Sequence, residues 1–176
     1  MQHLRYSRTA RILHWVIGVL VLGQIALGFV ADALAKPTAQ WVAELHVQTG
    51  IIILILMLVR LAWRALVPPP PLPQSHPEWQ RAAAATTHSL LYFLLFGMLV
   101  SGLTVWLWIG DPVVLFGTVP LPLPRIGGED EFWLSVAGYF HEYGAWAITA
   151  FIVLHIGAAL GHEWILRDRL IRDRML

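Results

Sequence analysis

The sequence predicts an all-α integral membrane protein, a bundle of four transmembrane helices that forms a single domain over residues 1–176. Hydrophobic residues make up 57% of the chain and charged residues only 13%, a balance far from that of soluble domains. Four apolar stretches are each about 20 residues long, which is enough to cross a hydrocarbon core of about 30 Å as a helix. Basic residues gather beside alternate ends of these stretches. These observations together predict the fold class.

The expected spans are Ile12–Leu34, His46–Val67, His88–Ile109 and His141–Leu166. The first follows a basic start and ends in Ala33-Leu34-Ala35, which also resembles a signal peptide with its cleavage site. Its apolar run is longer than the core of a typical signal peptide, so we expect it to be retained as a span.

The links between the spans are rich in proline. Pro68–Pro73 predicts a stiff extended spacer in the second link. The third link runs from Gly110 to about Phe140, and its four prolines and Gly127-Gly128 pair exclude a long continuous helix. Within it we expect a short interfacial helix over Phe132–Tyr139.

Because the number of spans is even, both termini lie on one side of the membrane. Ten of the twelve basic residues share that side, namely Arg5, Arg8, Arg11, Arg60, Arg64, Arg81, Arg167, Arg169, Arg172 and Arg174. The positive-inside rule therefore predicts that both termini are cytoplasmic. Lys36 and Arg125 remain on the outer side.

The net charge of +1 argues against a nucleic-acid partner. The chain has no cysteine, so a metal must rest on histidine or carboxylate.

Of the six histidines in the expected spans, His162 is near the inner end of the fourth, and the other five are His14, His46, His88, His141 and His155. Metal-binding side chains are costly inside a membrane, so each needs a reason. A single isolated histidine would most often be an interfacial or hydrogen-bonded residue. Five histidines spread over all four helices favour a shared role in holding a cofactor.

The spacing of these histidines predicts two cofactor sites at two depths. His141 and His155 are fourteen residues apart, which returns them to nearly the same helix face and separates them by about 21 Å. Since consecutive helices are antiparallel, His46 comes level with His141 near the outer surface, and His14 comes level with His155 near the inner surface. Two imidazoles on one iron leave no open axial position, which is typical of an electron carrier. The pattern therefore predicts two haems.

Several neighbouring residues follow the same interval. Gly28 and Gly102 lie fourteen residues after His14 and His88, where a missing side chain would let a haem approach or let helices pack closely. Arg60 lies fourteen after His46, and its guanidinium would either pair with a haem propionate or snorkel to the interface.

The remaining histidines have more than one interpretation. His88 is an interfacial side chain that contacts a propionate or a backbone carbonyl, or else a ligand. His162 is a membrane-edge histidine exposed to solvent, or a polar contact to a propionate or a quinone. His3 and His76 are interpreted as solvated. The quinone pocket has no short motif, and Arg167, Asp168 and His162 are candidates only by their place at the inner edge.

The chain resembles the bacterial cytochrome b561 family, and in particular its superoxide oxidase branch, over almost its whole length. The supporting segments are Arg11-Ile-Leu-His14-Trp15, His46-Val-Gln-Thr-Gly50, Leu58-Val-Arg60-Leu-Ala-Trp-Arg64, His88-Ser-Leu-Leu-Tyr92, Met98-Leu-Val-Ser-Gly102, Leu115-Phe116-Gly117 with Pro120, His155-Ile-Gly-Ala-Ala-Leu-Gly-His162, Arg167-Asp168 and Arg174-Met175-Leu176.

The resemblance implies a multi-pass protein of the bacterial inner membrane, surrounded by lipid, with two haems b. It implies the ligand pairs His14 with His155 and His46 with His141. It also implies that electrons enter at the periplasmic face, from superoxide in that branch, and leave to ubiquinone. Lys36 and Arg125 are then the candidates for attracting superoxide, or else are simply exposed loop charges.

Two rival interpretations come from other classes of protein. The outer links are rich in acidic residues, which favours a membrane-anchor subunit that takes electrons from a periplasmic dehydrogenase, hydrogenase or basic electron carrier. A transporter or scaffold without haem is the third interpretation, and an absence of haem from the purified protein would favour it.

Overall fold

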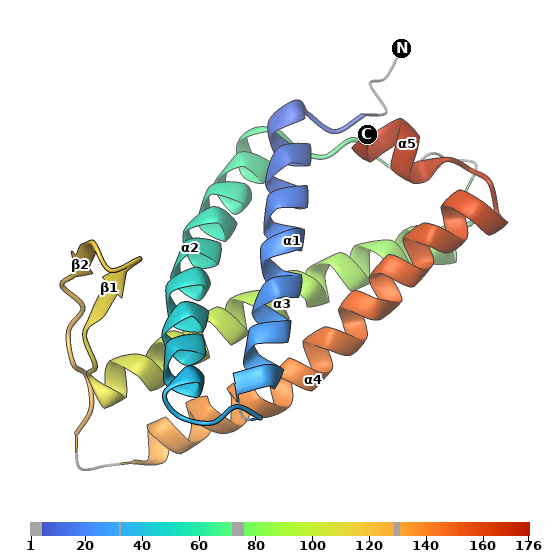
Figure 1. Ribbon diagram of the computed structural model, residues 1–176. Coiled ribbons are helices and arrows are strands. Elements are labelled where there is room, and N and C mark those ends of the chain that lie inside the picture. Colours follow the sequence, from blue (N-terminus) through green and yellow to red (C-terminus); the bar gives the residue numbers. More distant parts are fainter. Residues whose placement is uncertain (1–4, 32, 72–75, 129–130) are drawn as a thin grey trace.

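Four long helices form the protein, and a computed structural model describes residues 5–31, 33–71, 76–128 and 131–176. The helices are α1 (Arg8–Ala31), α2 (Thr38–Leu66), α3 (Glu78–Ile109) and α4 (Phe132–Leu160). Each is long and apolar enough to cross a membrane, α4 together with the turn that follows it. Figure 1 shows the start of α1 and the end of the chain at the same end of the bundle. The predicted fold of four spans is confirmed.

Prolines and a glycine set the helix boundaries. Pro37 and Pro77 occupy the N-cap positions of α2 and α3, where a missing backbone N–H costs nothing. Gly110 ends α3 in the left-handed conformation, and its N–H donates to the carbonyl of Trp106 at 2.9 Å. Both α2 and α3 therefore begin about two to three turns before the spans predicted from hydropathy.

The expectation of a separate interfacial helix over Phe132–Tyr139 was wrong. These residues are the first turns of α4, which continues without a break to Leu160. The reason is local: after Pro124 no proline follows in the chain, so nothing forces the helix to stop at the membrane surface.

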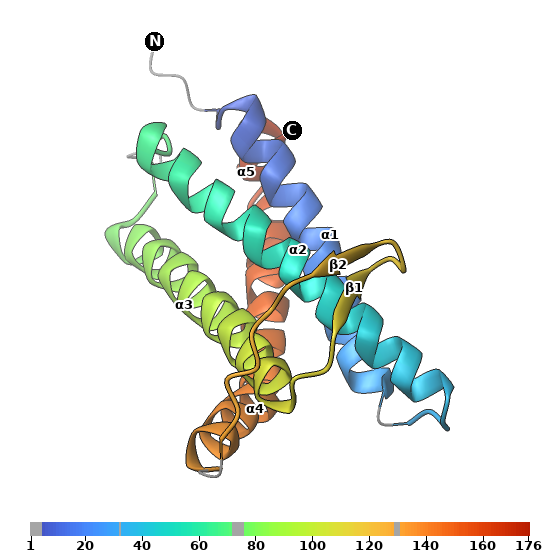
Figure 2. The same cartoon turned by 90° about the vertical axis from the view of Figure 1, so that its left-hand side faces the viewer.

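The third link contains a short antiparallel hairpin, which the all-α prediction did not include. Strands β1 (Val113–Leu115) and β2 (Val119–Leu121) pair with Val113 opposite Leu121. Phe116 and Gly117 turn the chain with positive φ angles of 49° and 69°. The N–H of Phe116 donates to Gln48 Oε1 on α2 at 2.8 Å. Figure 2 shows the hairpin beside α2, so we call this the hairpin end of the bundle.

The helices pack in two pairs, α1 on α2 and α3 on α4, with α2 also contacting α3. A small core lies between them, formed by Ile17, Val21, Ile53, Met57 and Leu99. In the described chain, α1 and α4 have hardly any close backbone contact. The bundle is therefore least closely packed where α1 faces α4.

The opposite end, which we call the arginine end, is closed by the C-terminal segment. After α4 the chain forms a π-helical turn, Gly161–Ile165, and then helix α5 (Leu170–Met175). Arg174 on α5 is only 5% exposed and donates to the carbonyls of Pro70 and Pro71 at 2.6 and 2.9 Å. The predicted spacer Pro68–Pro73 thus includes a docking point for α5, and its residues 72 and 73 lie outside the described part of the chain.

Candidate haem sites

The histidine pair at the hairpin end joins α2 to α4. The ring centres of His46 and His141 are 6.0 Å apart, and the ring planes meet at 82°. Two metal–imidazole bonds of about 2 Å, with about 1 Å from each nitrogen to its ring centre, would separate two axial rings by about 6 Å. The predicted pair is therefore brought together at a spacing suitable for axial ligands of one iron.

Hydrogen bonds orient the ring of His141. Its Nδ1 lies 3.1 Å from the carbonyl oxygen of Met98 and 3.2 Å from Oγ of Ser101. A proton on Nδ1 that is donated to this carbonyl leaves Nε2 unprotonated, which is the state that a metal requires. We expect Nε2 of His141 to be its ligating atom.

The backbone of His46 is fixed by two polar residues that the sequence reasoning missed. The side-chain amide of Gln24 on α1 donates to the carbonyl of His46 at 2.7 Å, and Thr49 Oγ1 donates to Gln24 Oε1 at 2.6 Å. Nδ1 of His46 is buried and has no hydrogen-bond partner among the described residues. The sequence did contain a signal for Gln24. It is a polar residue inside an apolar span, where a polar side chain is costly unless it has a partner.

Gly28 and Gly102 lie against this histidine pair. A Cβ added to Gly102 would come within 2.7 Å of Cε1 of His141, and one added to Gly28 would lie 3.3 Å from Cε1 of His46. These glycines thus leave room for the histidine rings themselves. The fourteen-residue interval predicted their level correctly.

The pair at the arginine end joins α1 to α4. The ring centres of His14 and His155 are 6.3 Å apart, with an angle of 84° between their planes. The ring of His88 on α3 also lies near, at 5.5 Å from that of His155. The structure thus brings three histidines together at this level, and the spacing of His14 and His155 matches the pair at the hairpin end more closely.

Arg60 lies at the same level and is already engaged by a tyrosine. Its Nε donates to the hydroxyl of Tyr92 at 2.9 Å. The guanidinium of Arg64 lies 5.6 Å from the centre of the same ring. Neither arginine forms a salt bridge within the described residues. The contact of Arg60 with a propionate stays a prediction.

The two candidates for attracting superoxide are both exposed. Arg125 packs its side-chain carbons over Gly110, and Lys36 lies in the link between α1 and α2. Neither forms a salt bridge in the chain as described. Three acidic residues of the outer links, Asp32, Glu129 and Asp130, lie outside the described residues.

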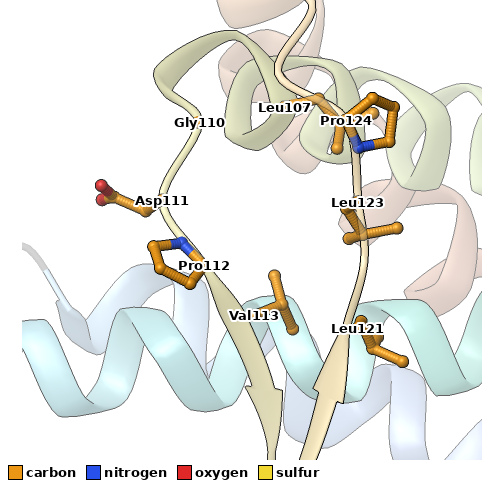
Figure 3. A pocket seen from close by; sticks show the side chains of 8 residues that line it. All are labelled: Leu107, Gly110, Asp111, Pro112, Val113, Leu121, Leu123 and Pro124. Atoms are coloured by element: carbon orange, nitrogen blue, oxygen red, sulfur yellow. The ribbon is translucent and has the colours of Figure 1, made fainter.

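A hollow of about 210 Å³ lies between α3 and the base of the hairpin. It is lined by Leu107, Gly110, Asp111, Pro112, Val113, Leu121, Leu123 and Pro124. Figure 3 shows the carboxylate of Asp111 pointing away from the other side chains. The lining is therefore mainly apolar and contains no basic residue, so this hollow is not suited to binding superoxide.

The interpretation of His76 and His162 as solvated side chains was wrong. Their side chains are 12% and 21% exposed, and both contact Asp168. The sequence pattern missed this because His76 lies in a link, far from Asp168 along the chain. Arg167, which the sequence suggested as a candidate for the quinone pocket, is exposed and has a φ of 58°.

The residues present fit haem. They form two opposed histidine pairs, in one of which a hydrogen bond fixes the tautomer of His141, and glycines leave room for the rings of the pair at the hairpin end.

Comparisons with known proteins also indicate a haem protein. A family model for prokaryotic cytochrome b561 matches residues 5–176. The chain is 34% identical over 177 residues to cytochrome b561 homolog 2 of Escherichia coli, covering 98% of this chain and 91% of that one.

Two other relatives are more distant. A probable superoxide oxidase CybB of Yersinia pestis is 25% identical, over 98% of this chain and 97% of its own. Cytochrome b562 of Cereibacter sphaeroides is 27% identical, over 97% of this chain and 94% of its own. With its four membrane-spanning helices, this chain therefore belongs to the prokaryotic cytochrome b561 family and is a membrane electron-transfer protein that carries haem b.

Proposed function

We propose that this protein is a superoxide:ubiquinone oxidoreductase with two haems b. The observation that carries the proposal is the pair of opposed histidine sites, His46 with His141 and His14 with His155, at ring spacings of 6.0 and 6.3 Å. Haem held by two imidazoles exchanges single electrons without an open position for oxygen. Superoxide is a one-electron donor, which suits such a centre.

The net reaction balances: two superoxide ions and two protons reduce one ubiquinone to ubiquinol and release two molecules of dioxygen. His46 and His141 would hold the haem at the hairpin end, proposed as the periplasmic side. His14 and His155 would hold the second. Arg60 and His88 would contact propionates at the arginine end, proposed as the cytoplasmic side of the bacterial inner membrane.

Lys36 and Arg125 would draw superoxide to the hairpin end. Both are exposed cations on that side, and a positive charge raises the encounter rate of an anion in a way that falls with salt. The Yersinia pestis relative, which aligns over nearly the whole of both chains, is named a probable superoxide oxidase, and this name supports superoxide as the electron donor.

The test is a pulse of superoxide given anaerobically to the detergent-purified, haem-loaded protein with a soluble ubiquinone analogue. We expect the haem bands to show reduction and then reoxidation by the quinone. Arg125→Ala and Lys36→Ala should each slow the reduction about two- to tenfold at low salt. Glu44→Gln, which removes an exposed negative charge near the same end, should not slow it. Haems that do not respond to superoxide would contradict the proposal.

A second candidate function is a membrane-anchor subunit that receives electrons from a periplasmic redox protein. The acidic side chains of Glu44, Asp111, Glu131 and Glu142 are exposed at or near the hairpin end, which suits a basic electron carrier. Under this function superoxide would not reduce the haems. A reduced basic carrier would reduce them, at a rate that falls as the salt concentration rises.

A further inference from the structure

Three side chains from separate segments meet at the arginine end. His76 lies just before α3, His162 lies in the π-helical turn after α4, and Asp168 lies before α5. His162 Nδ1 and His76 Nε2 lie 2.5 and 3.2 Å from Asp168 Oδ2. One ligand atom from each residue falls within 4.8 Å of the other two. Two imidazoles thus converge on a single carboxylate oxygen.

The exposure of this cluster suits a small cation. The side chains of the three residues are 12%, 21% and 23% exposed, so they are partly shielded from water and still open to an ion.

Part of the spacing suits a small tetrahedral ion. Bonds of about 2 Å at a tetrahedral angle place neighbouring ligand atoms about 3.3 Å apart, close to the 3.2 Å between His76 Nε2 and Asp168 Oδ2. His162 Nδ1 lies only 2.5 Å from the same oxygen, so a bound ion would replace this hydrogen bond and move the two groups apart by about 0.8 Å. A hollow of about 40 Å³ adjoins both histidines, which is large enough for a water molecule as a fourth ligand. Arg81 in its lining is paired with Glu78 at 3.7 Å.

We propose that His76, His162 and Asp168 form a binding site for a divalent transition-metal cation of the zinc class, with water as the fourth ligand. Two histidines and one carboxylate are a recurrent ligand set for zinc. The ion would join the start of α3, the end of α4 and the segment before α5. Its binding would stabilise the arginine end without taking part in electron transfer, so the inference does not depend on the proposed donor or acceptor.

The test uses the full-length, haem-loaded protein in detergent, freed of loosely bound metal with a chelator and titrated with Zn²⁺ by calorimetry. We expect one Zn²⁺ per chain, and at least tenfold weaker binding in Asp168→Asn and His76→Ala. Asp173→Asn, which changes an exposed carboxylate on α5, should bind as the wild type does. An unchanged haem spectrum verifies that each variant is folded.

A thermal measurement separates the site from scattered surface binding. Zn²⁺ should raise the midpoint of heat-induced haem loss in the wild type and in Asp173→Asn, because a ligand bound to the folded state stabilises it. It should not raise the midpoint in Asp168→Asn. Equal Zn²⁺ affinity in Asp168→Asn and the wild type, or no stoichiometric binding in either, would overturn the proposal.

Discussion

At the scale of single residues, Gly102 determines where the ring of His141 can lie. An added Cβ would approach the Cε1 atom of that ring to 2.7 Å, closer than such contacts allow. His141 Nδ1 is meanwhile held by the carbonyl of Met98 at 3.1 Å. The ring cannot move away from a new methyl group without losing this hydrogen bond, so the site depends on a glycine that makes no polar contact itself.

We therefore predict that Gly102→Ala lowers the haem content from two per chain to about one. Displacement of a ligand that is fixed by hydrogen bonds typically costs 10- to 100-fold in metal affinity. Pyridine haemochrome quantification against protein mass measures this content. Gly157→Ala is the matched control, because a Cβ there meets nothing within 4 Å. Retention of both haems with an unchanged spectrum in Gly102→Ala would show that His141 does not need this clearance.

The choice between His14 and His88 is also made at this scale. Both rings lie near His155, with ring centres 6.3 and 5.5 Å away. We predict that His14→Ala loses one haem and that His88→Ala keeps both, because the first spacing matches the 6.0 Å of the pair at the other end more closely. Reduced-minus-oxidised spectra of the two variants report the outcome. The opposite pattern would assign His88 as the ligand.

At the scale of elements, α5 closes the arginine end. Arg174 contributes two hydrogen bonds to the Pro70 and Pro71 carbonyls, and its carbonyl accepts from the N–H of Tyr6 at 3.2 Å. Trp15 Nε1 also donates to the carbonyl of Met175 at 3.2 Å. The C-terminal helix therefore ties the start of α1 to the link before α3.

Arg174→Ala should loosen this closure. Hydrogen bonds of a charged group contribute about 1.5–3 kcal/mol each, so we expect a lower midpoint for heat-induced loss of haem absorbance and faster proteolysis after Leu166. Arg8→Ala, which removes an exposed arginine at the same end, should change neither. Proteolysis of Arg174→Ala at the wild-type rate would show that α5 is held by other contacts.

Hydropathy predicted the helices but not what lies between them. Strands β1 and β2 have only three residues each, too few to show an alternating pattern, and β2 contains Pro120. The π-helical turn and the left-handed Arg167 and Arg169 have no signal in composition. These features depend on contacts between segments far apart in the sequence, such as Phe116 with Gln48.

At the scale of the whole molecule, helix geometry explains why the candidate sites were partly predictable. A fourteen-residue interval fixes both the face and the depth of His141 and His155, and antiparallel packing then brings His46 and His14 level with them. The same reasoning placed Gly28 and Gly102 correctly. It could not predict the hydrogen bond from Gln24 to the carbonyl of His46, or the contact of His76 with Asp168. Neither contact follows from periodicity along one helix.

The central claim is that two histidine pairs, sharing α4, hold two haems b at two depths. The most direct test is the ratio of haem b to protein in the wild type and in the double variant His141→Ala with His155→Ala, measured by pyridine haemochrome quantification. We expect two haems per chain in the wild type and none in the double variant. A single haem in the wild type, or haem retained by the double variant, would contradict it.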